Sequence, residues 1–202
     1  AWAKRADMSE KMTEERLIAL LQGVEAAIVG VVPMTARVLQ SAPALKVVSM
    51  HGVGVDHIDL NAAARCGVIV ANCPGVNGEA VADLAIGLML AVARQIPRAD
   101  ADARQGQWTV HQGSELWRKT LGLVGLGHVG RAVARRAAGF DMRVLAYDPY
   151  VDSSQAAEVG VILTELDEVL AEADFVSLHT PLNEQTRHII GSRELERMKP
   201  NA

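Results

Sequence analysis

The stretch GLGHVG at residues 125–130 decides the fold of this chain. It fits the pattern G-x-G-x-x-G, which is weak evidence by itself, but an apolar run at 121–124 precedes it and a helical pattern at 129–139 follows it. Asp148 ends the next apolar run, 18 residues after Gly130, which makes the whole unit about 30 residues long. A strand, a glycine turn, a helix and a second strand ending in an acidic residue indicate a dinucleotide-binding βαβ unit.

Each position of this unit has a physical role. Gly125 makes the tight turn, Gly127 lets a pyrophosphate approach the backbone, and Gly130 lets helix and strand pack closely. The helix N-terminus offers free N–H groups and a positive dipole end to phosphates. Asp148 can accept hydrogen bonds from ribose hydroxyls and would repel a 2′-phosphate, and residues 149–151 bring no cation, so NAD is favoured over NADP. The alternatives are a turn that binds nothing and a turn for another mononucleotide, whereas the lack of a G-K-[ST] ending excludes a P-loop.

Apolar runs of strand length alternate with helical patterns along the whole chain, which predicts an α/β fold with a parallel sheet. The predicted helices cover 13–22, 35–41, 60–66, 78–98, 129–139, 166–173 and 192–198, and the predicted strands cover 26–32, 45–50, 68–71, 121–124, 143–147, 161–163 and 175–178. Residues 106–119 are polar and irregular. Pro74 and Gly75 mark a break, so we expect a domain boundary near Pro74.

The composition argues against several classes of function. Half of the residues are apolar, enough for a sizeable core, and the net charge of −4 argues against nucleic-acid and anionic-membrane partners, which favour a basic face. The longest apolar run, 84–93, is about half of the ~20 residues that span a bilayer. Cys66 and Cys73 are too few for a disulfide framework or a thiolate metal site, so we expect a cytoplasmic protein without a metal.

Residues 119–149 closely resemble the D-isomer-specific 2-hydroxyacid dehydrogenases, in the string KTLGLVGLGHVGRAVARRAAGFDMRVLAYDP. Three other stretches agree with that family: LKVVSMHGVGVDHID at 45–59, the V-A-D helix and A-R-Q-I-P within 72–108, and HTPLNEQTRHII followed by MKP within 179–200. The match covers nearly the whole chain in order, and the phosphoglycerate dehydrogenase type looks nearest.

The resemblance implies an NAD-dependent oxidoreductase that acts on the CH–OH group of a D-2-hydroxy acid, with 3-phosphoglycerate as one candidate. It implies a Rossmann-type doubly wound parallel sheet, truncated here, plus part of a flavodoxin-like substrate domain. Residues 1–74 would be a partial substrate-binding domain, and residues 75–202 an NAD-binding domain incomplete at its C-terminus. The family's catalytic arginine, glutamate and histidine are expected beyond Ala202, so we expect this fragment alone to be inactive and predict no catalytic residue within it.

The resemblance also carries over site residues on the substrate side. The loop Gly52, Val53 and Gly54 matches the loop whose N–H groups face the substrate carboxylate and the nicotinamide, so Val53 is a candidate for both ligands. Asn77 matches a position that lines the substrate cleft. His51 stands beside the loop as a candidate substrate contact, with a polar surface role as the alternative.

On the cofactor side, His128 and Val129 match loop positions that contact the pyrophosphate. Pro149 follows Asp148 at the ribose. Thr180 and Pro181 match the turn at the edge of the adenine ribose, and His179 ends the strand before them, where it either fixes the turn by hydrogen bonds or transfers a proton.

Several polar residues have simpler structural interpretations. Asp56 and Asp59 are predicted to cap the helix that begins near residue 60. Asp83 is predicted to make a structural hydrogen bond. Arg135 and Arg136, which follow each other in the sequence, are predicted to form a solvated helix face.

The expected partners are a small 2-hydroxy or 2-keto acid and, for the full-length protein as in most of the family, a second copy of the chain that pairs through the helix at 78–98 and the segment after it. Met50 stands where many relatives have Arg or Lys, and a cation there would help to hold an anionic substrate. Two alternatives remain open: an NAD(H)-binding protein like the corepressors that share this fold, and an inert pseudo-enzyme. The sequence does not name the hydroxy acid.

Overall fold

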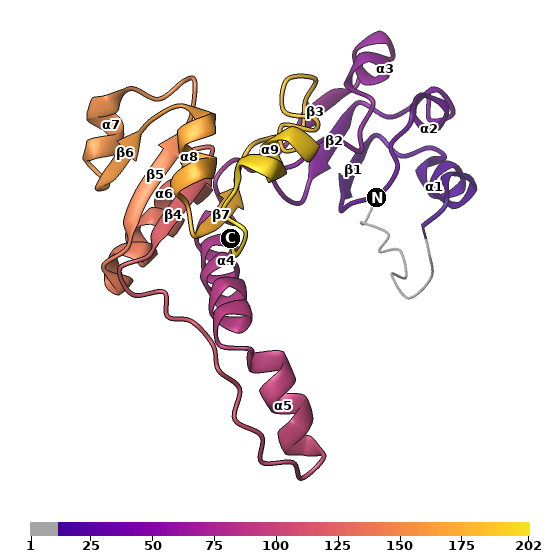
Figure 1. Cartoon of the computed structure of the whole chain (residues 1–202). Coiled ribbons are helices and arrows are strands. Elements are labelled where there is room, and N and C mark those ends of the chain that lie inside the picture. The colour runs from indigo at the N-terminus through magenta and orange to yellow at the C-terminus, as the bar shows by residue number, and fades with distance from the viewer. Residues whose placement is uncertain (1–11) are drawn as a thin grey trace. The chain divides into compact units, whose positions relative to one another are not determined.

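The computed structural model describes residues 12–202, and the chain divides into two compact units, Ala1–Val76 and Asn77–Ala202. The sequence predicts a boundary between residues 74 and 75. In the structure the first unit ends two residues later, at Val76. Figure 1 shows both units along the chain. Each has its own hydrophobic core, so each is described by itself.

The first unit is built on a three-stranded parallel sheet in the order β1-β2-β3. Its elements are α1 (Glu14–Leu21), β1 (Ala26–Val29), α2 (Ala36–Gln40), β2 (Val47–Met50), α3 (Leu60–Arg65) and β3 (Ile69–Ala71). In the register of the sheet, Ala27 lies opposite Val48, and Val48 lies opposite Val70. All six elements begin and end within three residues of the predicted ranges.

Side-chain caps set where the helices of this unit begin. The hydroxyls of Thr13 and Thr35 accept hydrogen bonds in the first turns of α1 and α2. Asp59 Oδ1 accepts from the N–H of Ala62, 2.8 Å away, and so caps α3. Each cap satisfies one N–H group that has no partner within its helix. The predicted cap at Asp59 is confirmed, and Asp56 is not a helix cap.

The second unit contains a four-stranded parallel sheet in the order β6-β5-β4-β7. Its elements are α4 (Gly78–Ala93), α5 (Ile96–Arg104), β4 (Thr120–Val124), α6 (His128–Ala137), the short 3₁₀ helix η1 (Ala138–Phe140), β5 (Arg143–Tyr147), α7 (Ser153–Ala157), β6 (Val161–Leu163), α8 (Leu166–Glu172), β7 (Phe175–Leu178) and α9 (Ser192–Arg197). The chain runs outward from β4 through β5 to β6 and then returns to β7 beside β4. This reversal of direction is the hallmark of the predicted Rossmann-type, doubly wound sheet.

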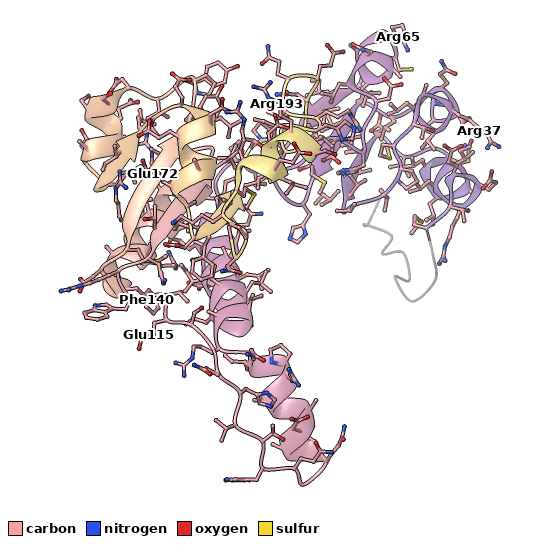
Figure 2. All side chains as sticks on the ribbon, in the orientation of Figure 1. Arg37, Arg65, Glu115, Phe140, Glu172 and Arg193 are labelled. Atoms are coloured by element: carbon pink, nitrogen blue, oxygen red, sulfur yellow. The ribbon has the colours of Figure 1, made fainter. Side chains whose placement is uncertain are left out.

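Successive residues of a strand point to opposite faces of the sheet. In this unit helices cover both faces, so residues of both kinds are buried. Leu121 and Leu123 of β4 are fully buried in a core cluster with residues of α4 and α6. Between them, Gly122 faces α8, and a Cβ on this glycine would lie 2.7 Å from Val169 Cγ1. Figure 2 shows Glu172 of α8, which forms an ion pair with Arg143 of β5.

The single helix predicted over residues 78–98 is wrong, because the structure has two helices, α4 and α5, with a bend of 65° between them. Gln95 separates them in the left-handed conformation, with φ 52°. Pro97 stands in the first turn of α5, and it has no N–H to donate to the carbonyl of Ala93, so α4 cannot continue through it. No single helix of residues 12–202 is long and apolar enough to cross a membrane, although α4 and α5 together reach that length and composition.

The helix α7 has no counterpart among the predicted elements. Its signal is a capping box: Asp152 accepts from the N–H of Gln155, and the Gln155 side chain accepts from the N–H of Asp152. An acidic residue followed three positions later by glutamine indicates a helix start, and the hydrophobic pattern of a five-residue helix is too short to show it.

Candidate dinucleotide-binding site

The carboxyl ends of β4, β5 and β7 bring the predicted cofactor residues to one edge of the sheet. The N–H of Gly125, after β4, donates to Tyr147 O at 2.8 Å, and the N–H of His179, after β7, donates to Val124 O at 2.8 Å. Asp148 follows Tyr147 directly. In open α/β sheets, ligands bind at this edge where the strand order reverses, which here lies between β4 and β7.

The three glycines of the turn differ in what surrounds them. Gly125 has φ +98°, and a Cβ on it would lie 2.7 Å from His179 O. A Cβ on Gly130 would lie 2.3 Å from Gly125 O. Gly127 is exposed, and a Cβ on it would meet nothing within 4 Å. The protein itself therefore requires glycine at 125 and 130, whereas the space beside Gly127 is open to a ligand.

The helix α6 begins beside this open space, at the residue after Gly127. Gly127 is its N-cap, and no side chain caps the helix. The first N–H groups of an uncapped helix have no partner within the helix and carry the positive end of its dipole. His128 is exposed and Val129 is partly exposed at this position, as a contact with a pyrophosphate requires. The residues present thus fit the phosphates of a dinucleotide.

Asp148 has a second role that the sequence did not indicate. Its Oδ2 accepts from the N–H of Leu126 at 2.8 Å, and its Oδ1 accepts from the N–H of Tyr150 at 2.9 Å. The carboxylate therefore holds the glycine turn to the end of β5. A carboxylate has about four lone-pair sites, so each oxygen can still accept a bond from a ribose hydroxyl.

A pocket of about 340 Å³ adjoins Asp148 at the ends of β5 and β6. It is lined by Tyr147, Asp148, Pro149, Leu163, Thr164 and Glu165. The pocket includes Pro149, which the resemblance placed at the ribose, and Asp148 and Glu165 give it two carboxyl groups.

His179 follows the last residue of β7, and its side chain contacts Ser177 within that strand. Its Nε2 lies 2.9 Å from Ser177 Oγ, and burial lowers the pKa of the imidazole below its ordinary value. Thr180 comes next, with its Cγ2 3.1 Å from where a Cβ on Gly125 would be, so it lies against the glycine turn. Pro181 is exposed, and its carbonyl accepts a hydrogen bond from Thr186 Oγ1.

Sequence reasoning missed Arg131, in the first turn of α6. Its Nε donates to Leu126 O at 3.0 Å, so it contacts the glycine turn directly. The pKa of Asp152 lies below its ordinary value, chiefly because Ser154 Oγ and the N–H of Gln155 donate to it, with a smaller contribution from the charge of Arg131. A cation immediately after the last glycine of the motif was the available signal.

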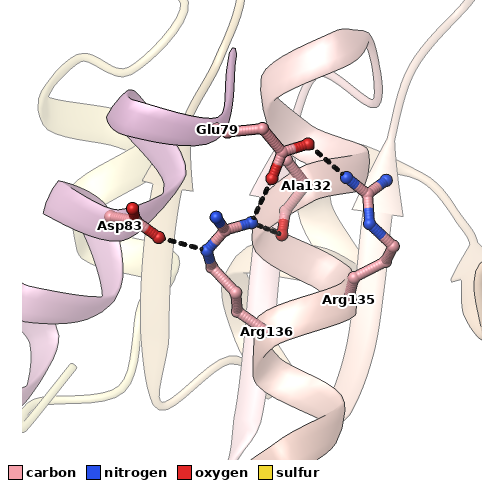
Figure 3. Close-up of polar contacts among 5 residues, drawn as sticks. All are labelled: Glu79, Asp83, Ala132, Arg135 and Arg136. Carbon is pink, nitrogen blue, oxygen red and sulfur yellow. Dashed lines mark hydrogen bonds and ion pairs between the residues drawn. The ribbon is translucent and has the colours of Figure 1, made fainter. Parts of the chain in front are cut away.

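Four charged side chains join α4 to α6 beside this site (Figure 3). Arg136 donates to Asp83 Oδ1 at 2.6 Å and to Glu79 Oε2 at 2.7 Å, and Arg135 lies 2.5 Å from Glu79 Oε1. The hydrogen bond from Arg136 holds the pKa of Glu79 below its ordinary value. The predicted hydrogen bond of Asp83 is confirmed. The predicted solvated face is wrong for Arg136, whose side chain is 26% exposed and ion-paired.

The helix α4 also approaches the turn at its own start. A Cβ on Gly78 would lie 3.7 Å from His128 Cβ and 3.8 Å from His128 O. Asn77, predicted to line the substrate cleft, is the exposed N-cap of α4 and makes no side-chain cap bond. The first turn of α4 therefore packs on the first residue of α6.

The other predicted substrate residues belong to the first unit, in the loop after β2. Gly52 has φ +149°, and its carbonyl accepts from the N–H of Cys73 at 2.9 Å. Asn72 Nδ2 donates to Val53 O at 2.8 Å, so the carbonyl oxygens of the loop face its own unit. Gly54 and His51 are exposed. Among residues 12–202, no three His, Cys, Asp or Glu side chains gather as metal ligands would.

Comparisons with known proteins agree with this site. The family model described as "D-isomer specific 2-hydroxyacid dehydrogenase, NAD binding domain" matches residues 86–202. The chain is 40% identical over 200 residues to a D-3-phosphoglycerate dehydrogenase of Methanocaldococcus jannaschii, covering 97% of this chain and 38% of that protein. It is 41% identical over 213 residues to a glyoxylate reductase of Korarchaeum cryptofilum, covering 100% of this chain and 61% of that protein.

The solved structure of a D-lactate dehydrogenase from Aquifex aeolicus, complexed with NAD and lactic acid, superimposes with a TM-score of 0.81 at 32% identity. The match covers 94% of this chain and 56% of that one. The chain thus spans less than two thirds of the length of each of these proteins. The family model covers more than half of the chain and falls on the unit that carries the glycine turn. The chain therefore belongs to the D-isomer-specific 2-hydroxyacid dehydrogenases, and residues 86–202 correspond to the NAD-binding domain of that family.

Proposed function

We propose that this chain binds NAD(H) at the glycine turn as part of an oxidoreductase that interconverts a small D-2-hydroxy acid and its 2-keto acid. The observation that carries the proposal is the open space beside Gly127 under the uncapped start of α6. The backbone N–H groups there would hold the pyrophosphate, and Asp148 would hold the ribose. The nicotinamide supplies the hydride chemistry when bound, and the chain's own residues bind and orient it.

NAD rather than NADP is the proposed cofactor. A 2′-phosphate on the ribose would come next to the carboxylate of Asp148, whose two oxygens are fixed by backbone N–H groups and so cannot swing away. Glu165, in the adjoining pocket, adds a second acidic group. Like charges at close range in a partly buried site repel strongly enough to discriminate between ligands.

A 2-hydroxy or 2-keto acid without a phosphate group is the proposed substrate. Its carboxylate would bind the backbone N–H groups of Val53 and Gly54, because the N–H of Gly52 already donates to Met50 O at 3.0 Å. Met50, where many relatives have a cation, is 4% exposed and lies in the core of its unit, with its methyl carbon 3.3 Å from where a Cβ on Gly52 would be. This position therefore offers a phosphorylated substrate no positive charge.

The function is tested by titrating the protein with NADH and then measuring NADH oxidation with glyoxylate, pyruvate, hydroxypyruvate and phosphohydroxypyruvate. We expect saturable NADH binding and preference for an unphosphorylated acid. Since no residue here matches the family's catalytic arginine, glutamate or histidine, we expect a polypeptide of these 202 residues to bind NADH without turnover. Absence of NADH binding would refute the proposal, and binding without turnover in a chain that contains those three residues would favour a corepressor-like NAD(H) sensor.

We also propose that the protein is a homodimer that pairs through α4. Leu84, Leu88 and Val92 lie four residues apart on this helix and are 61%, 57% and 75% exposed. Trp108 and Val110, in the segment after α5, are 97% and 92% exposed. A continuous apolar stripe at helical spacing is typical of a surface that another helix covers.

Size-exclusion chromatography with light scattering, which measures the molar mass of the protein in solution, tests whether it is a dimer. We expect the wild type to have twice the mass of one chain and Leu88→Glu to have the mass of one chain. Leu195→Glu is the matched control, because Leu195 on α9 is equally exposed at 59% but lies outside the stripe. A Leu88→Glu variant that stays dimeric, or a wild type with the mass of one chain, would contradict this interface.

A further inference from the structure

The peptide unit between Leu126 and Gly127 is hydrogen-bonded by a side chain that is not part of the glycine motif. Arg131 Nε donates to Leu126 O at 3.0 Å, from one helical turn further along α6. On the other side of the same residue, the N–H of Leu126 donates to Asp148 Oδ2 at 2.8 Å. The Leu126 side chain is fully buried. Leu126 is thus fixed at its N–H, its carbonyl and its side chain.

The fixed carbonyl matters because a peptide unit is planar and trans, so its C=O and its N–H point in opposite directions. The carbonyl that Arg131 holds belongs to the same unit as the N–H of Gly127. Gly127 has no Cβ, so no side chain at this position restricts its backbone torsions. The hydrogen bond from Arg131 to the Leu126 carbonyl is therefore a contact that fixes the direction of the Gly127 N–H.

We propose that Arg131 is a positioning residue for cofactor binding: it orients the peptide unit 126–127 so that the N–H of Gly127 is preset as a donor to the pyrophosphate. Asp148 fixes the preceding peptide unit through the N–H of Leu126, so the two side chains hold successive units of the turn. This inference rests on the proposed function, because it assigns a role within the same site. Preorganised donors bind more tightly because their ordering cost is met during folding.

The chain offers a matched control for Arg131. Arg135 lies one turn further along α6, and its guanidinium contacts Glu79 rather than the glycine turn. Arg131→Met and Arg135→Met remove the same charge from the same helix, and methionine keeps most of the length of the side chain. Arg131→Lys keeps the positive charge but replaces the planar guanidinium by one ammonium group. All variants are first compared with the wild type by thermal unfolding.

Binding is measured with three probes: NADH, ADP-ribose and adenosine. Loss of a charge-assisted hydrogen bond is expected to weaken NADH and ADP-ribose about tenfold in Arg131→Met. Adenosine lacks the pyrophosphate, so its affinity should stay within about twofold of the wild type, and Arg131→Lys should recover part of the loss. Arg135→Met should leave all three affinities unchanged. A general loss of structure would instead weaken the three ligands together.

A spectroscopic measurement on the free protein separates this inference from the proposed function. In Arg131→Met and Arg131→Lys we expect a shift of the Leu126 carbonyl ¹³C resonance and broadening of the Gly127 amide signal, both absent in Arg135→Met. Unchanged Leu126 and Gly127 resonances, or equal weakening of adenosine and ADP-ribose, would overturn the role of Arg131. If the wild type binds neither NADH nor ADP-ribose, the proposed function fails, while the resonances still decide whether Arg131 orients the peptide.

Discussion

Replacing Gly127 by alanine should remove NADH binding while leaving the fold intact. Gly127 has φ −74° and ψ −156°, which alanine adopts readily, and its Cβ would meet nothing within 4 Å. The free energy of unfolding should therefore change by less than about 1 kcal/mol, since alanine restricts the unfolded chain but is a poorer N-cap than glycine, and the two effects oppose each other. The added methyl group occupies the space that a pyrophosphate would fill. We expect the Kd for NADH to rise at least about tenfold, or ~1.4 kcal/mol of binding free energy.

Gly130→Ala should behave differently at a position only three residues away. Its Cβ would lie 2.3 Å from Gly125 O, 0.7 Å inside the 3.0 Å that real Cβ atoms keep. The start of α6 must move away from the turn by a similar distance, which should cost about 1–3 kcal/mol of folding free energy, as overpacking does. Both stability and NADH affinity should therefore fall. Gly139→Ala is the control, because a Cβ there meets nothing and Gly139 lies in η1, beyond the C-terminal end of α6.

The assay combines urea unfolding with NADH fluorescence titration on the three variants. The expected pattern is loss of binding alone for Gly127→Ala, loss of both properties for Gly130→Ala and loss of neither for Gly139→Ala. A Gly127→Ala protein that binds NADH as tightly as the wild type would refute the reasoning, because the pyrophosphate could then not approach the backbone at Gly127. A destabilised Gly127→Ala protein would show that the space beside this residue is not open.

Three further changes test the surroundings of the site. Asp148→Ala should reduce the preference for NADH over NADPH, and it should also weaken NADH binding because the N–H of Leu126 loses its acceptor. An unchanged ratio of the two dissociation constants in parallel titrations would exclude charge repulsion as the basis of selectivity. Burial lowers the pKa of His179, so the imidazole binds a proton more readily in the unfolded chain than in the folded protein. The neutral histidine therefore contributes to stability above its ordinary pKa of 6.5, and this contribution is lost as the pH falls through the pKa of the folded state. His179→Asn should accordingly flatten the fall of the urea midpoint between about pH 7.5 and pH 5, and an equally steep fall would argue against this role. Arg136→Gln should make the melting temperature less sensitive to added salt, since ion pairs with Glu79 and Asp83 are screened by salt; equal sensitivity in both proteins would show that the cluster adds no stability.

The order and type of most elements could be predicted from local signals. Apolar runs of strand length placed the seven predicted strands, and the predicted cap at Asp59 placed the start of α3. Thr13 and Thr35, predicted as the first residues of two helices, are the N-caps of α1 and α2. The failures have local physical reasons as well. At Gln95 and Pro97 the proline inside the predicted helix was a local signal for a break, whereas hydrophobic periodicity reports which residues are buried and not where the helix axis bends.

The candidate site was predictable as far as its motif reaches. The glycine spacing and the acid at the end of β5 are sequence features, and the open space beside Gly127 and the close contacts of Gly125 and Gly130 fit the roles expected of them. The hydrogen bonds of Asp148 and Arg131 to Leu126 were not predictable. Nothing in the spacing of Arg131 and Asp148 shows that both side chains turn toward the backbone of the same residue, Leu126.

The sequence by itself determined the fold class, the position of the phosphate turn and the family, because strand–turn–helix signals and glycine spacing act over a few residues and survive without tertiary context. The tertiary structure decided which partners the charged side chains take. Arg136 reaches back to Glu79 and Asp83, more than fifty positions earlier in the chain, because α4 packs against α6. Asp148 meets Leu126 because parallel pairing of β4 with β5 places the end of one strand beside the end of the other. Such contacts depend on the packing of distant segments, and so no local pattern encodes them.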